Sequence, residues 1–366
     1  MFIHLHCHSH YSFLRGVASP EKLVAAAADQ NMPAVALTDT NGLYSAVQFY
    51  QAARDKGIKP IIGVTLDANV GDEKEERHIA LVLLAMDKTG YSNLCRLVTL
   101  RHLGTTKLAD NSRDTEDRPV TLQELAQHNA GVIALCPLAF ATKRNDDREK
   151  TEPFAPAEDA MVHFAALKNI FGDRLYLEVH HLSPGEGRTL REAQRIGREL
   201  HIPRVATNPV YFLQPEEHLH HRVVNAIRTG QLLTTVAPPE ITSPEAWFKS
   251  TAEMYKLFPD YPEFMQATLE IADRCNLELE LGNLILPDFP IPAGETFDSY
   301  LCKLCVAGAG RQYGSKIEKA FSRLIKELKI IEKKKLAPYF LLVWSIVQEA
   351  RRRGIWRSRR AAGIWR

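Results

Sequence analysis

The sequence has no apolar run long enough to cross a membrane, and no hydrophobic leader precedes its first apolar segment. Its six cysteines are scattered, and the one CxxC pair, Cys302 and Cys305, has no second pair to complete a zinc site. At helical spacing we interpret this pair as two packed thiols. These absences indicate no membrane partner and no disulfide framework, and they favour a protein of the reducing cytoplasm.

Neither sign of charge is scarce, but the two are unevenly placed. Residues 311–366 hold 16 Lys and Arg against 4 Asp and Glu, a net charge of +12, whereas the first 310 residues hold 30 against 40, a net charge of −10. An acidic body with a basic end indicates contact with a polyanion such as DNA. The candidate contacts are Lys333, Lys334, Lys335, Arg351, Arg352 and Arg353. A solvated lysine-rich helix face is the simpler alternative.

The opening residues, MFIHLHCHSHYS, place a histidine at every second position: His4, His6, His8 and His10. In an extended strand such residues point to one side, which is a geometry that lets two imidazoles bind one metal ion. A histidine-rich strand edge without a ligand is the alternative interpretation.

Buried strands alternate with helices along the first 207 residues. The opening segment is one predicted strand. The others are predicted at 34–38, 59–66, 78–86, 131–136, 174–179 and 204–207. This alternation predicts an α/β fold, either a (β/α) barrel with ligands at the carboxyl ends of its strands or a doubly wound open sheet. Two charged stretches, 105–119 and 143–156, are predicted to be exposed loops.

Residues 215–276 show a helical pattern without strand signals, and the proline-rich segment 286–296 is a predicted domain boundary. The expected organisation is a barrel domain at 1–214, a helical extension at 215–285 and a further region at 286–366. Helices are predicted in that last region at 297–307, 317–335 and 339–353.

Several motifs resemble one family. The stretches HLHCHSHYSFLRG, ALTDTNGLYSAVQFYQAARDKGIKPIIGV and HIALVLLAMDKTGYSNLCRLVT resemble the amino-terminal PHP (polymerase and histidinol phosphatase) domain of bacterial DNA polymerase III alpha subunits. VATNPVYF, LPDFPIPAGETFDSYLCKLC and PYFLLVWSIVQEARRRGI are similar to later parts of that family, in the same order. The resemblance implies a distorted (β/α) barrel of the PHP type, a helical linker and the beginning of a polymerase palm. It leaves the replicative and error-prone branches open.

The resemblance also implies a metal site. In the family, His, Asp, Glu and sometimes Cys side chains hold up to three ions, and the matching positions here are His6, His8, Asp39, His78 and His180, or His181 in place of His180. Five further ligand positions are held instead by Arg15, Thr40, Thr65, Pro209 and Tyr211, and these side chains are poor substitutes. The fixed charge of Arg15 is expected to take the place of a cation beside His6 and His8.

We therefore expect a degenerate site with weak or no loading of Zn²⁺ or Mn²⁺, in a PHP domain that acts as a scaffold. A residual single-ion site formed by His6, His8 and His78 is the alternative.

The end of the chain departs from the family. Where the family continues with a glycine-rich segment that contacts the incoming nucleotide, this chain has WRSRRAAGIWR, and no Asp-x-Asp follows residue 287. The carboxylates that hold Mg²⁺ in the full-length polymerase are thus expected beyond residue 366. The resemblance implies a truncated nucleotidyltransferase of DNA replication or repair that cannot extend a primer alone. Its expected partners are DNA and, through the missing part, other holoenzyme subunits. A free-standing PHP phosphoesterase and a non-catalytic interaction module are the rival hypotheses.

Overall fold

The structure is a computed structural model, which describes residues 1–71, 77–104, 118–138, 140–142, 150–152, 157–181, 187–236, 241–282, 288–314 and 317–355. Contacts divide the chain into two units, Met1–Leu279 and Glu280–Arg366. The predicted loops at 105–119 and 143–156 lie mostly outside the described residues. Within the second of them, however, Lys150–Glu152 is a strand.

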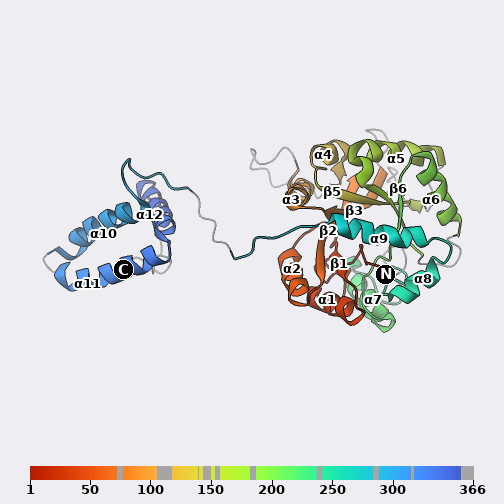
Figure 1. Cartoon of the computed structure of the whole chain (residues 1–366), viewed down its shortest axis with the longest axis horizontal. Helices are drawn as coiled ribbons and strands as arrows, with labels where there is room; N and C mark the ends of the chain where they lie inside the picture. Colours follow the sequence, from red (N-terminus) through yellow and green to blue (C-terminus); the bar gives the residue numbers. More distant parts are fainter. Residues whose placement is uncertain are drawn as a thin grey trace. The chain divides into compact units, whose positions relative to one another are not determined.

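A nine-stranded sheet forms the frame of the first unit (Figure 1). Its strands are β1 (Ala34–Leu37), β2 (Lys59–Asn69), β3 (Arg77–Ala85), β4 (Val120–Thr121), β5 (Val132–Pro137), β6 (Phe140–Thr142), β7 (Lys150–Glu152), β8 (Leu175–Val179) and β9 (Arg204–Ala206). The main path runs β1-β2-β3-β5-β8-β9, while β4 pairs with β2, and β6 pairs with β3 and β7.

The parallel arrangement that the strand–helix alternation predicts is interrupted at β3. This strand runs antiparallel to both β2 and β5, whereas the β1–β2, β5–β8 and β8–β9 pairs are parallel. The connection explains the difference, because only residues 70–76 separate β2 from β3. A crossover to a parallel strand needs a dozen residues or more.

The opening segment closes the sheet into a distorted barrel. On one side the backbone N–H groups of Ala36 and Thr38 donate to the carbonyls of His4 and Cys7, at 2.9 and 2.8 Å. On the other side Val210 exchanges hydrogen bonds with His6 and His8, at 2.9 and 2.8 Å. The segment therefore lies between β1 and the residues that follow β9. Its pairing is irregular, since Cys7–Val210 is its one bridge within the described residues.

Helices surround this barrel. They are α1 (Pro20–Asp29), α2 (Ala46–Asp55), α3 (Lys88–Leu103), α4 (Leu122–Gln127), α5 (Ala157–Phe171), α6 (Gly187–Glu199), α7 (His218–Thr229), α8 (Thr251–Leu257) and α9 (Pro262–Arg274). The start of α1 follows the sequence: the Ser19 hydroxyl accepts from the Lys22 N–H, and Pro20 occupies the first turn. The helical expectation for 215–276 is confirmed at α7, α8 and α9, but the described residues between α7 and α8, 230–236 and 241–250, contain no helix.

Two hydrophobic clusters cover opposite faces of the sheet. The larger one packs the outer helices against the strands, and the smaller one packs alternate strand residues against α9, with Ile61, Val82 and Leu135 fully or almost fully buried. Thr65 and Glu178 lie on this second face, two residues beyond Gly63 and Tyr176. The polar cluster described below thus sits in the carboxyl-terminal half of β2 and at the carboxyl end of β8, beyond the apolar layer under α9.

The second unit consists of three described helices, α10 (Phe297–Tyr313), α11 (Ile317–Lys333) and α12 (Ala337–Arg352). Among the described residues of this unit, the core has three buried residues, Leu301, Ala337 and Leu341. Cys305 packs against this core, whereas Cys302 is exposed, so the prediction of two packed thiols is confirmed for Cys305 alone. No helix among the described residues of either unit is long and apolar enough to cross a membrane.

Candidate functional site

His6 and His8 meet at the centre of a buried polar cluster. Their Nε2 atoms lie 3.0 Å apart, and the two residues are 7 % and 1 % exposed. The His6 Nδ1 lies 2.7 Å from Oε1 of Glu178, and the His8 Nδ1 lies 3.0 Å from the Ser12 hydroxyl. Each ring is therefore oriented through its Nδ1, and the two Nε2 atoms face each other.

The neighbouring hydroxyls determine where the protons lie. Ser12 donates its one proton to Oδ1 of Asp39, at 2.7 Å, so it accepts from the Nδ1–H of His8. Thr65 donates to the carbonyl of Thr38, at 2.9 Å, so it accepts from the Nε2–H of His6, 3.3 Å away. A neutral His8 then has a bare Nε2 that accepts from His6. The His6 Nδ1 faces the Glu178 carboxylate, so the ring of His6 is held by hydrogen bonds at both of its nitrogens.

Electrostatics agree with this assignment. Burial would raise the pKa of Glu178, but the His6 charge, its hydrogen bond, His180 and Thr207 outweigh burial and hold that pKa below its usual value. Burial, followed by the positive charge of His6, lowers the pKa of His8 well below its usual value, which keeps His8 neutral. Glu178 and His6 thus form a buried ion pair with side chains 0 % and 8 % exposed.

Glu178 is the functional residue that sequence reasoning missed. The available signal was an acidic residue inside the apolar strand RLYLEV. Its Oε1 also accepts from the Thr207 hydroxyl, at 2.7 Å, and within the described part of the chain its Oε2 has no hydrogen bond.

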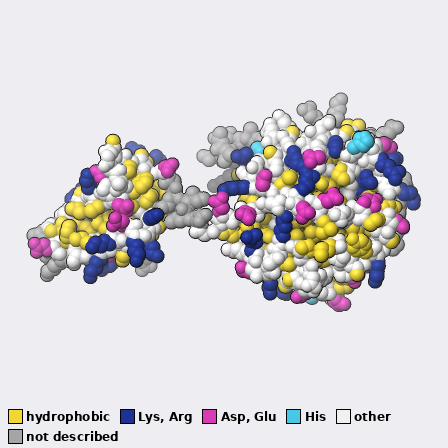
Figure 2. Space-filling view, viewed as in Figure 1, with side chains coloured by type: hydrophobic (Ala, Val, Ile, Leu, Met, Phe, Trp, Pro, Cys, Tyr) yellow, Lys and Arg dark blue, Asp and Glu magenta, His cyan; other side chains and the backbone are white. Residues whose placement is uncertain are grey.

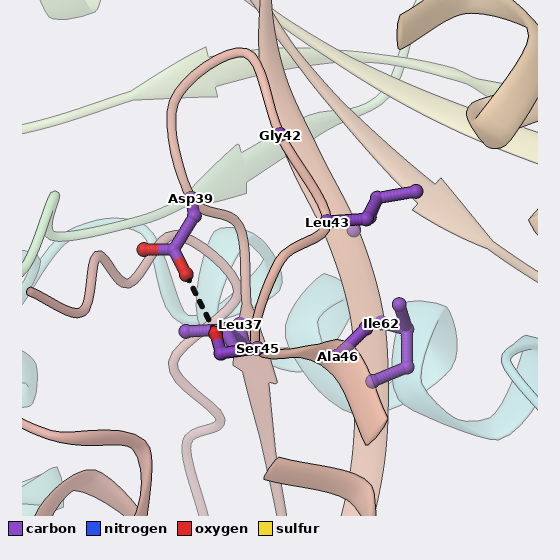
Figure 3. A pocket seen from close by; sticks show the side chains of 8 residues that line it. Leu37, Asp39, Gly42, Leu43, Ser45, Ala46 and Ile62 are labelled. Carbon is purple, nitrogen blue, oxygen red and sulfur yellow. Dashed lines mark hydrogen bonds between the residues drawn. The ribbon is translucent and has the colours of Figure 1, made fainter. Parts of the chain in front are cut away.

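Asp39 lies beside this cluster but is fully engaged by other groups. Its Oδ1 accepts from the Ser9 N–H and the Ser12 hydroxyl, both at 2.7 Å, and its Oδ2 accepts from the hydroxyls of Ser9 and Ser45, at 2.8 and 2.9 Å. Figure 3 shows the Ser45 contact beside a small pocket lined by Leu37, Leu43, Ala46 and Ile62, too narrow to admit a water molecule. Asp39 thus organises the Ser9–Ser12 turn.

Among the remaining predicted ligands, His78 is not brought to His6 and His8. His78 pairs with Asn69, four residues along β3 from Val82, which is opposite Thr65. At the rise of a strand this is about 13 Å away, so the single-ion alternative that includes His78 is wrong.

His180 is closer, with its Nε2 3.9 Å from Oε2 of Glu178 and its ring centroid 6.4 Å from that of His6. Burial comes first among the causes that lower the pKa of His180. His181 instead packs edge-on against Phe258, at 6.2 Å.

The opening histidines do not share one side. His4 packs between Phe2 and Phe248, and its Nε2 lies 2.8 Å from the Lys249 carbonyl, whereas His10 is exposed. The expected alternation fails because the segment is not a regular strand.

Arg15 is exposed, whereas His6 and His8 are buried, so the expectation that its charge takes the place of a cation beside them stays a prediction. Its positive charge is one of those that lower the pKa of His8, after burial and the charge of His6.

These donors do not fit a divalent metal ion. Within the described residues no group of three or more His, Cys, Asp or Glu side chains is placed to hold one. The Nε2 of His6, which faces His8, also lies 3.3 Å from the Thr65 hydroxyl, so this nitrogen already has two hydrogen-bond partners.

The six basic candidates lie on the second unit at opposite ends of α12. Lys333–Lys335 form the junction between α11 and α12, and Arg351–Arg353 close α12, which at 16 residues is about 24 Å long. All six are exposed. Arg352 and Arg353 pair with Glu349, at 2.7 and 2.6 Å. Figure 2 shows Lys and Arg side chains beside hydrophobic ones on this unit.

Comparison with known proteins places this fold in a class. The family model of the PHP domain matches residues 4–181, and that of the bacterial DNA polymerase III alpha NTPase domain matches residues 299–363. The first unit therefore contains a PHP domain, matched over residues 4–181.

Full-length relatives identify the family. The DNA polymerase III subunit alpha of Bacillus subtilis is 32% identical over 356 residues, which cover 97% of this chain and 30% of that protein. The error-prone DNA polymerase of Symbiobacterium thermophilum is 35% identical over 369 residues, which cover 97% of this chain and 32% of that protein. The chain belongs to the bacterial DNA polymerase III alpha subunit family and corresponds to its amino-terminal part. It spans about a third of the length of these relatives.

Proposed function

We propose that this chain forms the amino-terminal scaffold of a bacterial DNA polymerase, in which the PHP barrel supports the polymerase without hydrolysing phosphoesters. The observation that carries the proposal is that relatives named as DNA polymerases match 97% of the chain. The His6–His8 cluster supports the non-hydrolytic part of it, because it offers no set of three ligands among the described residues. In this proposal Zn²⁺ or Mn²⁺ loads weakly or not at all, and Mg²⁺ acts in the complete polymerase.

In this proposal residues 1–214 are the barrel, 215–285 its helical extension and 286–366 the start of the palm. The lysine and arginine clusters of the last region contact DNA, in replication or in error-prone repair synthesis in the bacterial cytoplasm. Holoenzyme subunits contact other parts of the polymerase.

Two assays on the purified chain test this function. On a primed template with four nucleotides and Mg²⁺ we expect no incorporation above a blank, because positioning cannot replace a pair of metal ions held by carboxylates. With Mn²⁺ or Zn²⁺ we expect no hydrolysis of a phosphomonoester such as p-nitrophenyl phosphate. Incorporation that survives repurification would overturn the scaffold assignment, and metal-dependent hydrolysis would favour the phosphoesterase alternative.

A further inference from the structure

Three residues at positions where the family resemblance expects metal ligands contact the two histidines. The Thr65 hydroxyl lies 3.3 Å from Nε2 of His6, and the Thr40 hydroxyl lies 3.4 Å from Nδ1 of His8. The ring of Tyr211 stacks on the ring of His8, with centroids 4.3 Å apart and planes inclined by 12°. The substituted positions therefore interact with the histidines directly.

The hydrogen bond from His6 to Thr65 is the most consequential of these contacts. The Thr65 hydroxyl accepts from the same nitrogen, Nε2, that a metal ion would need, and it lies on the side that faces His8. Its own proton is held by the Thr38 carbonyl, so it cannot reverse the direction of this bond. Thr65 is 5 % exposed, and water does not readily take over its role.

The cluster joins segments that are far apart in the chain. His6 belongs to the opening segment, Glu178 to β8 and Thr207 to the residues after β9, and the two hydrogen bonds on Oε1 of Glu178 connect all three, each at 2.7 Å. Thr65 adds β2. The histidines thus hold the opening segment in place where the barrel closes.

We propose that Thr65 closes this cluster to divalent metal ions and that His6, His8 and Glu178 act as a metal-free clasp at the closure of the barrel. The inference rests on the proposed function only in treating the PHP domain as a scaffold. The inference also identifies the residue that excludes the metal ion and the hydrogen bonds that replace metal coordination.

The test compares Thr65→Asp with Thr65→Asn in the full chain. Both side chains are close to threonine in volume, but only the carboxylate adds a third ligand beside the two imidazoles. After removal of metal and equilibrium dialysis against Zn²⁺, bound zinc is measured per chain, and the thermal midpoint is recorded with and without zinc.

We expect no bound zinc and no midpoint shift for the natural chain and for Thr65→Asn. For Thr65→Asp we expect one Zn²⁺ per chain and a midpoint that rises with zinc concentration, because an ion that binds the folded state stabilises it. Circular dichroism establishes that each variant is folded.

Zinc held by the natural chain, or by Thr65→Asn as well as by Thr65→Asp, would overturn the proposal. A folded Thr65→Asp that gains no zinc would equally show that Thr65 is not the excluding residue. If Thr65→Asp does not fold, the midpoint of the natural chain with chelator and with excess Zn²⁺ decides, since a shift contradicts the metal-free clasp. None of these outcomes bears on primer extension, so failure here and failure of the proposed function are distinguishable.

Discussion

The two units differ most in how they bury their side chains. The barrel unit has two large hydrophobic clusters and encloses an ion pair, whereas the three-helix unit buries Leu301, Ala337 and Leu341 among its described residues. All 14 histidines lie in the first 279 residues, and none lies in the last 87. The comparison indicates that the barrel unit is stable by itself and sensitive to its polar interior. The helical unit has little core and presents charge.

The largest expected effect tests the buried ion pair. Glu178→Ala should lower the free energy of unfolding of the barrel unit by about 3–5 kcal/mol, since it leaves His6 buried without its ion-pair partner. Urea unfolding followed by circular dichroism measures this. Glu216→Gln, at an exposed position, is the control and should change little. An equal effect of both substitutions would mean that the cluster contributes nothing particular.

The second prediction concerns the small core. Leu301→Ala should cost about 2–5 kcal/mol, as for any buried leucine, but here that destabilisation should unfold α10–α12 while the barrel remains folded. Hydrogen exchange of the two units measures the difference, and Ile346→Ala, at a position 60% exposed, is the control. If Leu301→Ala also increases exchange in the barrel sheet, the units are not independently stable.

The two units should differ in their stability at acidic pH. Burial lowers the pKa of His4 from its usual 6.5 to about 4, so the folded barrel binds fewer protons than the unfolded chain between these values. The stability that depends on a neutral His4 is complete above pH 6.5. It falls by about 3 kcal/mol as the pH falls towards 4.

A variant with Trp344, Trp356 and Trp365 changed to Phe leaves Trp247 as the fluorescent reporter of the barrel. His4→Gln should reduce the acid sensitivity, and His10→Gln, at an exposed site, should not. Acid unfolding that begins in the helical unit would contradict the comparison.

The smallest effect concerns DNA. Replacing Lys333, Lys334 and Lys335 with Ala should weaken binding equally for all sequences and should reduce the slope of log affinity against log salt by about 1 for each phosphate that is no longer neutralised. Fluorescence anisotropy over a salt series measures this slope. The matched control changes Lys22, Arg54 and Lys56, three exposed basic residues of the barrel unit. Binding that does not depend on salt, or that weakens equally in the control, would remove DNA contact from the helical unit.

The sequence predicted those parts of the fold that depend on local signals. The Ser19 cap and Pro20 at the start of α1 can be recognised in the sequence, and every strand predicted from an apolar run is present. The direction of β3 was missed, although the short connection from β2 carried that information. The opening histidines were misjudged because strand alternation requires regular pairing on both sides, and this segment has a single bridge among the described residues.

The candidate site depends on contacts that no local pattern reveals. His6 was predicted, but its ion-pair partner Glu178 lies 172 residues further along the chain. A lone acid in an apolar strand does not indicate its partner. The resemblance to the family located the substituted positions, yet only their geometry reveals that Thr65 accepts a hydrogen bond from His6.

The position of the opening segment has a consequence for synthesis on the ribosome. The first residues to be made need partners that are made last: the N–H of Ile3 donates to the Thr268 hydroxyl, 265 residues away, and His6 and His8 pair with Val210. At about 5–20 residues per second, the segment waits on the order of 10–50 s for these partners. During that time Phe2, Ile3 and Leu5, all buried in the finished barrel, remain without their final cover. The residues of this unit that are synthesised first are therefore the last to reach their folded positions, after α9 has left the ribosome.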